Sequence, residues 1–135
     1  MAGGSVSQVT NSRNKGCVGE REFADYLKAH GLEARRGQQF SGSKDSPDVV
    51  CPDLPDVHWE VKRREAGSVY LWLEQALEDG GAGKLHVVAH RRSHKEWIAV
   101  LPMEELVRLL ILRELHHATK AEDAQTCVEL ASGLL

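Results

Sequence analysis

Residues 47–63, PDVVCPDLPDVHWEVKR, decide how this chain is expected to fold. From Val57 to Arg63 apolar and polar side chains alternate, which is typical of a β-strand with one apolar and one polar face. Residues 47–51 are mostly apolar and predict a preceding strand. Residues 52–56 contain two prolines and two aspartates, which cannot continue a strand ladder and therefore indicate a turn. The stretch predicts a hairpin of two antiparallel strands.

Further helices and strands are expected on both sides of this hairpin. In chain order, they are a helix over 14–30, a strand over 32–36, a helix over 68–79, strands over 85–91 and 96–101, and a helix that begins at Pro102. The order of helix, three strands, helix and further strands predicts an α/β fold with a mixed central sheet flanked by helices.

The length of 135 residues favours one folded domain. Residues 1–13 are rich in Gly, Ser, Gln and Asn and show no hydrophobic period, so we expect a flexible N-terminal tail there. We expect the domain to span 14–112 and residues 113–135 to form a helical or partly disordered extension.

The formal charge is -3, with 17 Lys and Arg against 20 Asp and Glu, which is unlike a strongly basic nucleic-acid-binding protein. The acidity is concentrated in residues 96–135, which hold three basic and seven acidic residues. The N-terminus lacks the layout of a signal peptide, and no apolar run is long enough to span a membrane. We therefore expect a cytoplasmic protein without a membrane partner.

Charged side chains gather at the predicted hairpin. Glu60 and Lys62 share the polar face of one strand, and Asp48 begins the other, so the hairpin brings Asp48 near Glu60. Two carboxylates this close repel unless a cation lies between them, and ligands that are all oxygen favour Mg²⁺ or Mn²⁺. With Lys62 beside a metal-bound water, the set suits phosphodiester hydrolysis. The alternative is a solvated strand edge, where Glu-x-Lys pairs are usual.

A third acid, Glu20, lies on the predicted first helix. Its spacing places it on one stripe with Phe23, Ala24 and Leu27, which is expected to face the sheet. A lone carboxylate there needs a partner, and the site of Asp48 is an available one. Glu20 is otherwise a helix-surface residue.

Several motifs accompany these acids: KGCVGEREF at 15–23, Arg35-Arg36, Ser41-Gly42-Ser43, Pro47-Asp48 and Glu60-Val61-Lys62. Over residues 13–105 the chain resembles the PD-(D/E)-x-K nucleases, and within them the archaeal-type Holliday junction resolvases and their phage relatives. The resemblance implies a restriction-endonuclease-like αβββαβ core.

The resemblance also implies an activity. It is that of a Mg²⁺-dependent endonuclease, with Mn²⁺ as a substitute, which resolves four-way DNA junctions by paired nicks. Catalysis is assigned to Glu20, Asp48, Glu60 and Lys62, and metal binding to the three acids with the backbone carbonyl of Val61. Including the basic run after the strand, the residues expected to contact DNA are Lys15, Arg21, Arg35, Arg36, Ser41, Ser43, Arg63, Arg64 and Gln75.

Other interpretations stay open for parts of this set. The run Arg63-Arg64 is otherwise a solvated strand end, Gln75 a core-capping or surface residue, and His58 a surface histidine rather than a spare metal ligand. Two opposed cuts require two sites, which implies a homodimer, with the apolar helix at 106–112 as a candidate interface. Alternative functions are a flap, repair or restriction-like nuclease on the same fold, or a non-catalytic DNA-binding module.

Overall fold

A computed structural model describes the backbone of residues 6–38 and 46–133, with side chains described from Gly16 onward. Ser41 and Ser43 lie outside the described residues, as does the side chain of Lys15. The chain divides into two compact units, Met1–Leu101 and Pro102–Leu135, and each is described by itself.

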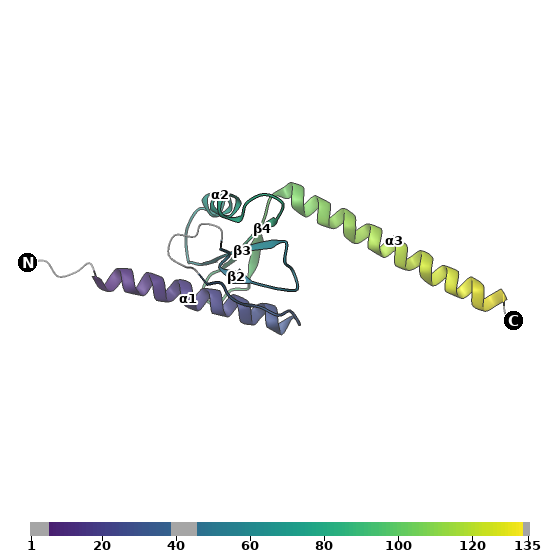
Figure 1. The fold of residues 1–135 in the computed structure, drawn as a ribbon, viewed down its shortest axis with the longest axis horizontal. Helices are drawn as coiled ribbons and strands as arrows, with labels where there is room; N and C mark the ends of the chain where they lie inside the picture. The colour runs from purple at the N-terminus through teal and green to yellow at the C-terminus, as the bar shows by residue number, and fades with distance from the viewer. Residues whose placement is uncertain (1–5, 39–45, 134–135) are drawn as a thin grey trace, which may run out of the picture. The chain divides into compact units, whose positions relative to one another are not determined.

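The first unit is built around a five-stranded mixed sheet (Figure 1). Its elements are α1 (Val6–Ala29), β1 (Arg35–Arg36), β2 (Val49–Val50), β3 (Val57–Arg63), α2 (Val69–Gly80), β4 (Leu85–Arg91) and β5 (Ile98–Val100). The strands lie in the order β1-β2-β3-β4-β5; β3 and β4 are parallel, and the other neighbours are antiparallel. The predicted α/β class with a mixed sheet is confirmed.

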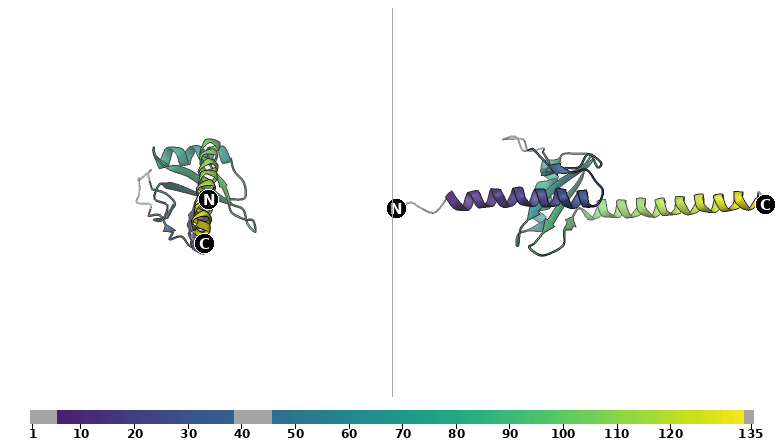
Figure 2. Two further views of the ribbon diagram at one scale, coloured as in Figure 1. Left: turned by 90° about the vertical axis from the view of Figure 1, so that its right-hand side faces the viewer. Right: turned by 90° about the horizontal axis from the view of Figure 1, so that it is seen from below.

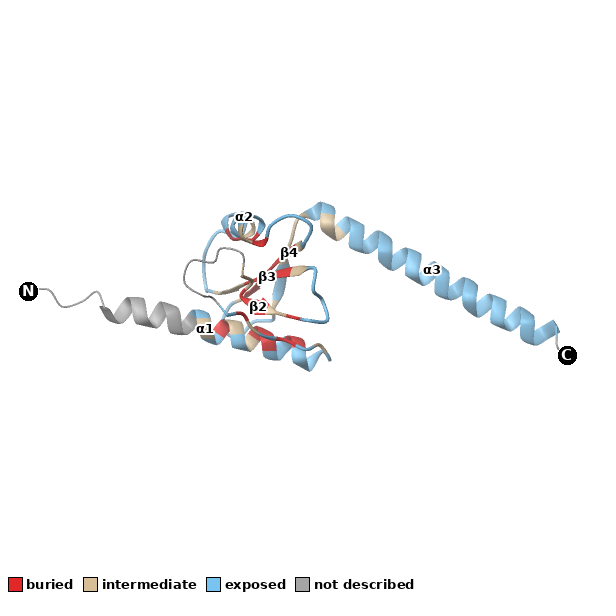
Figure 3. Cartoon of the chain, in the orientation of Figure 1, coloured by how far each residue is buried: buried red, intermediate tan, exposed pale blue. Residues whose placement is uncertain are grey.

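A helix covers each face of the sheet (Figures 1 and 2). On the α1 face, Phe23, Ala24 and Leu27 pack with Val49 and with the half-buried Trp59 of β3. On the α2 face a second cluster contains Trp72, Ala76 and Val88. Successive residues of a strand point to opposite faces of the sheet. Since α1 packs on one face and α2 on the other, side chains on both faces of β3 and β4 are shielded from solvent (Figure 3).

The hairpin is present with the expected topology. β2 pairs with β3 in antiparallel register, with Val49 opposite Trp59. The turn between them is closed by two backbone hydrogen bonds between residues three apart. The Leu54 N–H donates to the Cys51 carbonyl, and the Val57 N–H donates to the Leu54 carbonyl. β4 coincides with the predicted strand over 85–91.

Some boundaries differ from the expectation. α1 begins at Val6 rather than near residue 14, because residues 6–15 contain neither Gly nor Pro to interrupt a helix. The first two strands are only two residues long, shorter than the runs 32–36 and 47–51.

The second unit is one long helix, α3 (Met103–Gly133), which continues without a break past residue 112. The Arg108 guanidinium pairs with Glu104 and Glu105 in its first turns, at 2.7 and 3.2 Å. None of its described residues is buried (Figure 3). Among the described residues no helix is both long and apolar enough to cross a membrane.

Candidate active site

Asp48 lies immediately before β2, where the hairpin holds it against β3. Its backbone N–H donates to the Trp59 carbonyl at 3.0 Å, and its Oδ2 accepts from the N–H of Val61 at 2.8 Å. Its exposed fraction is 9%. The predicted approach of Asp48 to the Glu60 strand is therefore present, and the backbone of β3 fixes the carboxylate.

Glu60 and Lys62 point to the α2 face of β3. Glu60 is only 5% exposed. The Lys62 ammonium lies 3.1 Å from Glu60 Oε1 and donates to Oε1 of Gln75 on α2, also at 3.1 Å. Gln75, for which the sequence left a surface role open, thus fixes the lysine from the neighbouring helix.

The electrostatics of the two acids show that their charges are incompletely balanced. Burial, followed by the negative charge of Glu60, raises the pKa of Asp48 to about 7, although the Val61 N–H opposes this shift. Burial also raises the pKa of Glu60, while Lys62 opposes it. Glu20 adds a smaller repulsion to both carboxyl groups. Binding of a proton or of a cation would reduce the repulsion between these carboxylates and the cost of burying their charges.

Glu20 has a partner that the sequence did not indicate. Its Oε2 pairs with the Nε of Arg36 on β1. Glu20 is therefore near enough to Asp48 and Glu60 to disfavour their charges, but its own charge is balanced by Arg36. No group of three or more His, Cys, Asp or Glu side chains in the described part of the chain lies close enough to hold a metal ion.

The residues nevertheless fit a hard divalent cation in one respect. Both buried carboxyl groups have raised pKa values, that of Asp48 partly because of Glu60, and that of Glu60 partly because of Asp79 and Glu20. Their donor atoms are all oxygen, which is the ligand chemistry of Mg²⁺ and Mn²⁺. Glu20 could act as a third ligand only if its ion pair with Arg36 were broken.

The described residues expected to contact DNA fall into two groups. In the first group each side chain already has a partner within the chain: Arg36 pairs with Glu20, and Gln75 accepts from Lys62. Arg63 pairs with Glu22 of α1 at 3.0 Å and with Glu65 at 3.6 Å. The other group is exposed, and its members are Arg21, Arg35 and Arg64. Arg63 thus ties β3 to α1, a role that the sequence interpretation missed because it depends on packing between elements.

His58 is buried, so its expected place on the surface is wrong. It is 1% exposed and lies next to His86 of β4, with which it is in register. Gly80 of α2 closes over both rings, since a Cβ there would lie 2.3 Å from His86 and 2.8 Å from His58. Neither ring nitrogen of His58 has a hydrogen-bond partner, and Nε2 lies 4.0 Å from Glu60 Oε2. The near-continuous apolar sequence of β4 was the available signal that this face is covered.

Comparison with known proteins assigns the chain to a family. The family model for the archaeal Holliday junction resolvase (Hjc) matches residues 11–134. The chain belongs to the Hjc family. The match extends beyond the 13–105 covered by the motifs, so it also includes α3. No curated protein and no solved structure matches the chain.

Membership of the Hjc family confirms the resemblance read from the motifs, together with the restriction-endonuclease-like fold. It also gives the general activity, that of a nuclease which binds and cuts DNA in the resolution of Holliday junctions.

Proposed function

We propose that this Hjc-family chain is a Mg²⁺-dependent, structure-specific endodeoxyribonuclease that resolves four-way junctions by paired nicks. The observation that carries the proposal is the constellation of Asp48, Glu60 and Lys62. One buried carboxylate lies in β3 and the other immediately before the neighbouring β2, the charge of Glu60 disfavours that of Asp48, and an ammonium is held 3.1 Å from Glu60. General nuclease activity follows from the family, whereas the metal and the cutting pattern are our proposal.

Asp48, Glu60 and the backbone carbonyl of Val61 would hold the metal ion, with Mn²⁺ able to replace Mg²⁺. The bound ion would supply Lewis acidity and lower the pKa of a bound water. Glu20 would join the set when Arg36 pairs with a DNA phosphate instead, since Arg36 can exchange one anion for another.

Lys62 is the residue that would act on the scissile phosphate. Its ammonium has two acceptors, one on its own strand and one on α2, so its position is fixed from two elements. If Glu60 binds a cation, Gln75 still holds Lys62 as a neutral acceptor. The ammonium can then stabilise the charge that develops on the phosphate or position the attacking water.

Exposed guanidinium groups would bind the DNA backbone. Arg21, Arg35 and Arg64 are exposed and therefore available to phosphate oxygens. Such contacts position a duplex without reading its sequence, which suits a substrate recognised by its branched shape.

The test is cleavage of a synthetic four-way junction by the full chain, with Mg²⁺ and with EDTA, beside flap, fork and linear duplex substrates. We expect Mg²⁺-dependent, symmetric nicks across the junction. Preferential cutting of flaps or linear duplex would assign the site to another nuclease of this fold, and binding without any cleavage would leave a DNA-binding module.

Two variants and a control locate the chemistry. Asp48→Asn is expected to abolish metal-dependent cleavage, and Lys62→Met to slow it by about 100-fold or more. Asp56→Asn, an exposed acid in the turn of the same hairpin, is the matched control and should leave cleavage unchanged. Undiminished cleavage by Asp48→Asn would refute the site assignment.

A further inference from the structure

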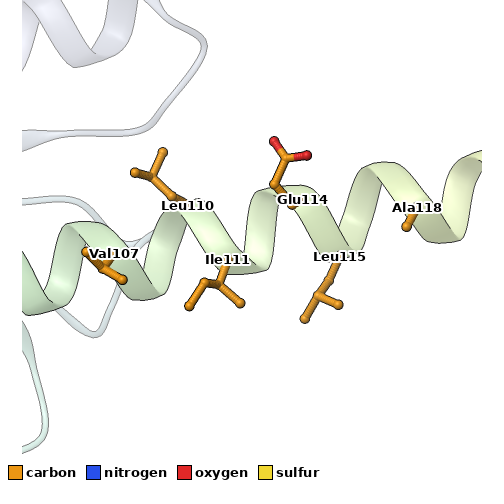
Figure 4. Close-up of a pocket in the computed structure, with 6 residues that line it drawn as sticks. All are labelled: Val107, Leu110, Ile111, Glu114, Leu115 and Ala118. Carbon is orange, nitrogen blue, oxygen red and sulfur yellow. The ribbon is translucent and has the colours of Figure 1, made fainter.

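The described residues contain two features that the proposed mechanism does not use. One is an exposed apolar surface of α3, lined by Val107, Leu110, Ile111, Glu114, Leu115 and Ala118 (Figure 4). Its lining is almost entirely aliphatic, so it offers no chemistry to the reaction. The other is a pair of buried histidines, His58 on β3 and His86 on β4, and the first of them lies beside Glu60.

His58 is buried without partners for its ring nitrogens. Its side chain is 0% exposed, and among the described residues neither Nδ1 nor Nε2 has a hydrogen-bond partner. An unpaired polar atom costs free energy when it is buried, so the ring is expected to find an acceptor or a donor. One acceptor is near, because Nε2 lies 4.0 Å from Oε2 of Glu60.

The two carboxylate oxygens of Glu60 face different neighbours. Oε1 lies 3.1 Å from the Lys62 ammonium, whereas Oε2 lies on the side of His58. A hydrogen bond spans about 2.7–3.2 Å, so the separation from Nε2 is about 1 Å too long. The terminal torsion of a glutamate is broad, and a small rotation of the carboxylate closes this gap.

The ring of His58 is held in place by α2 and β4. A Cβ at Gly80 of α2 would lie 2.8 Å from its Cγ, and the ring of His86 lies beside it, with 5.8 Å between the ring centres. The same helix carries Gln75, which accepts from Lys62. α2 therefore positions both polar neighbours of Glu60 on β3.

His58 is suited to donate a hydrogen bond without adding a positive charge. Burial, followed by the nearby His86, lowers the pKa of His58, although Asp79 opposes the shift. The ring is therefore neutral at neutral pH and carries one N–H. Carboxylates that bind metal ions are usually held by hydrogen bonds from such neighbours, and a neutral donor does not repel the ion.

We propose that His58 is a positioning residue of the nuclease, which donates a hydrogen bond from Nε2 to Oε2 of Glu60 and so fixes the orientation of that carboxylate. His58 acts here through the proposed metal site, so the inference rests on the proposed function. It adds a residue outside the ligand set that determines how tightly the ion is held. Loss of such a neighbour typically weakens metal binding or activity by about 10- to 100-fold.

The first experiment observes the imidazole nitrogens of the full chain by NMR in EDTA. We expect the proton of His58 on Nε2, with a nitrogen chemical shift that changes when Glu60→Ala removes the acceptor. The signals of His58 are assigned by their loss in His58→Gln. A proton on Nδ1, or an Nε2 signal that is identical in the wild type and in Glu60→Ala, would show that the hydrogen bond is absent and overturn the proposal.

The second experiment measures the Mn²⁺ affinity of three variants by calorimetric titration. The amide nitrogen of His58→Gln lies near the former Nε2, whereas that of His58→Asn lies near the former Nδ1. We expect His58→Gln to bind Mn²⁺ nearly as tightly as the wild type, and His58→Asn and His58→Leu to bind it about 10-fold more weakly or worse. Equal weakening in all three would assign His58 to packing alone and contradict the proposal.

Folding of each variant is checked by circular dichroism. If His58→Leu does not fold, the two amide variants still decide the question, because both are polar and differ mainly in the position of the donor. His86→Gln is the matched control, since His86 is in register with His58 and Glu60 is in register with Val88. It should bind Mn²⁺ as the wild type does, and a loss as large as that of His58→Leu would mean that packing of the pair is responsible.

Cleavage of a four-way junction separates a positioning role from a catalytic one. His58→Leu should raise the Mg²⁺ concentration needed for half-maximal cleavage by about 10-fold, while the rate at saturating Mg²⁺ stays close to that of the wild type. Lys62→Met, by contrast, should cut slowly at every Mg²⁺ concentration. A deficit of His58→Leu that excess Mg²⁺ does not restore would argue against positioning of the metal site.

Two results distinguish this inference from the proposed function. A wild-type chain that neither binds Mn²⁺ nor cuts junctions would refute the proposed function, and the role of His58 with it. A wild-type chain that does both, while His58→Leu binds Mn²⁺ equally well, would overturn the role of His58 alone.

Discussion

Asp48 occupies surroundings that disfavour its charge. Burial and the neighbouring Glu60 carboxylate raise its pKa to about 7, from an ordinary value of 3.8. The folded chain therefore binds a proton at Asp48 more tightly than the unfolded chain does. Stability is highest below the unfolded pKa and falls as pH rises from about 4 to 7. The residue that serves the proposed chemistry thus weakens the metal-free fold at neutral pH.

Asp48→Asn should accordingly stabilise the metal-free chain while it removes cleavage. The amide oxygen can still accept from the Val61 N–H, so the main change is loss of the buried charge. We expect a gain in unfolding free energy of about 1–2 kcal/mol above pH 7, which declines to nothing near pH 4. Urea denaturation in EDTA at several pH values measures it. A gain that does not vary with pH would contradict the electrostatic origin.

The Glu20–Arg36 ion pair competes with metal binding if Glu20 completes the metal site. Arg36→Gln frees the carboxylate, so it should raise Mn²⁺ affinity in the absence of DNA. We expect about two- to fivefold, since a partly exposed ion pair contributes at most about 1 kcal/mol. Calorimetric titration with Mn²⁺ gives the value. Arg35→Gln, the exposed neighbour, is the control and should bind Mn²⁺ as the wild type does.

The first helix lies very close to β3, and one glycine permits this. A Cβ at Gly19 would lie 2.5 Å from the Cβ of Arg63, whereas a Cβ at Gly16 would meet nothing within 4 Å. The approach also sets the Arg63–Glu22 ion pair between the two elements. Of the two glycines in the motif at 15–23, only Gly19 is explained by packing.

The matched pair of substitutions separates packing from helix propensity. Gly19→Ala should lose roughly 1–3 kcal/mol of stability, because α1 must move away from β3. Gly16→Ala should gain about 0.5–1 kcal/mol, since alanine favours the helix. Thermal and chemical denaturation measure both. If Gly19→Ala is as stable as Gly16→Ala, the close approach of α1 to β3 is wrong.

Local sequence patterns sufficed for the hairpin, β4 and the α/β class, because alternation and turn residues are read within one element. They could not show what covers a polar strand face. The alternation in β3 is the same whether His58 faces water or Gly80 of α2, and the structure has the latter. The partners of Glu20 and Arg63 could not be predicted from local sequence patterns either, since each partner belongs to a different helix or strand.

At the scale of the whole molecule, a net charge of -3 opposes the binding of DNA, although residues 1–95 are nearly balanced, with 14 basic and 13 acidic residues. Two of those acids are Asp48 and Glu60, whose charges repel each other. The surface that meets the phosphates should therefore become attractive only when these acids are neutralised, by a metal ion or by substitution.

Glu60→Gln should consequently bind a four-way junction more tightly than the wild type in EDTA, although it does not cut. The substitution removes a negative charge and frees the Lys62 ammonium for a phosphate, so the affinity should fall more steeply with salt. Fluorescence anisotropy between about 50 and 200 mM salt measures both effects.

The control is Glu129→Gln, which changes the net charge equally but lies on α3. If the two variants bind alike, net charge rather than the Asp48–Glu60 site governs affinity. If Ca²⁺, a divalent ion chosen to support binding with little cleavage, brings the wild type to the affinity of Glu60→Gln, neutralisation of the acids is sufficient to explain the difference.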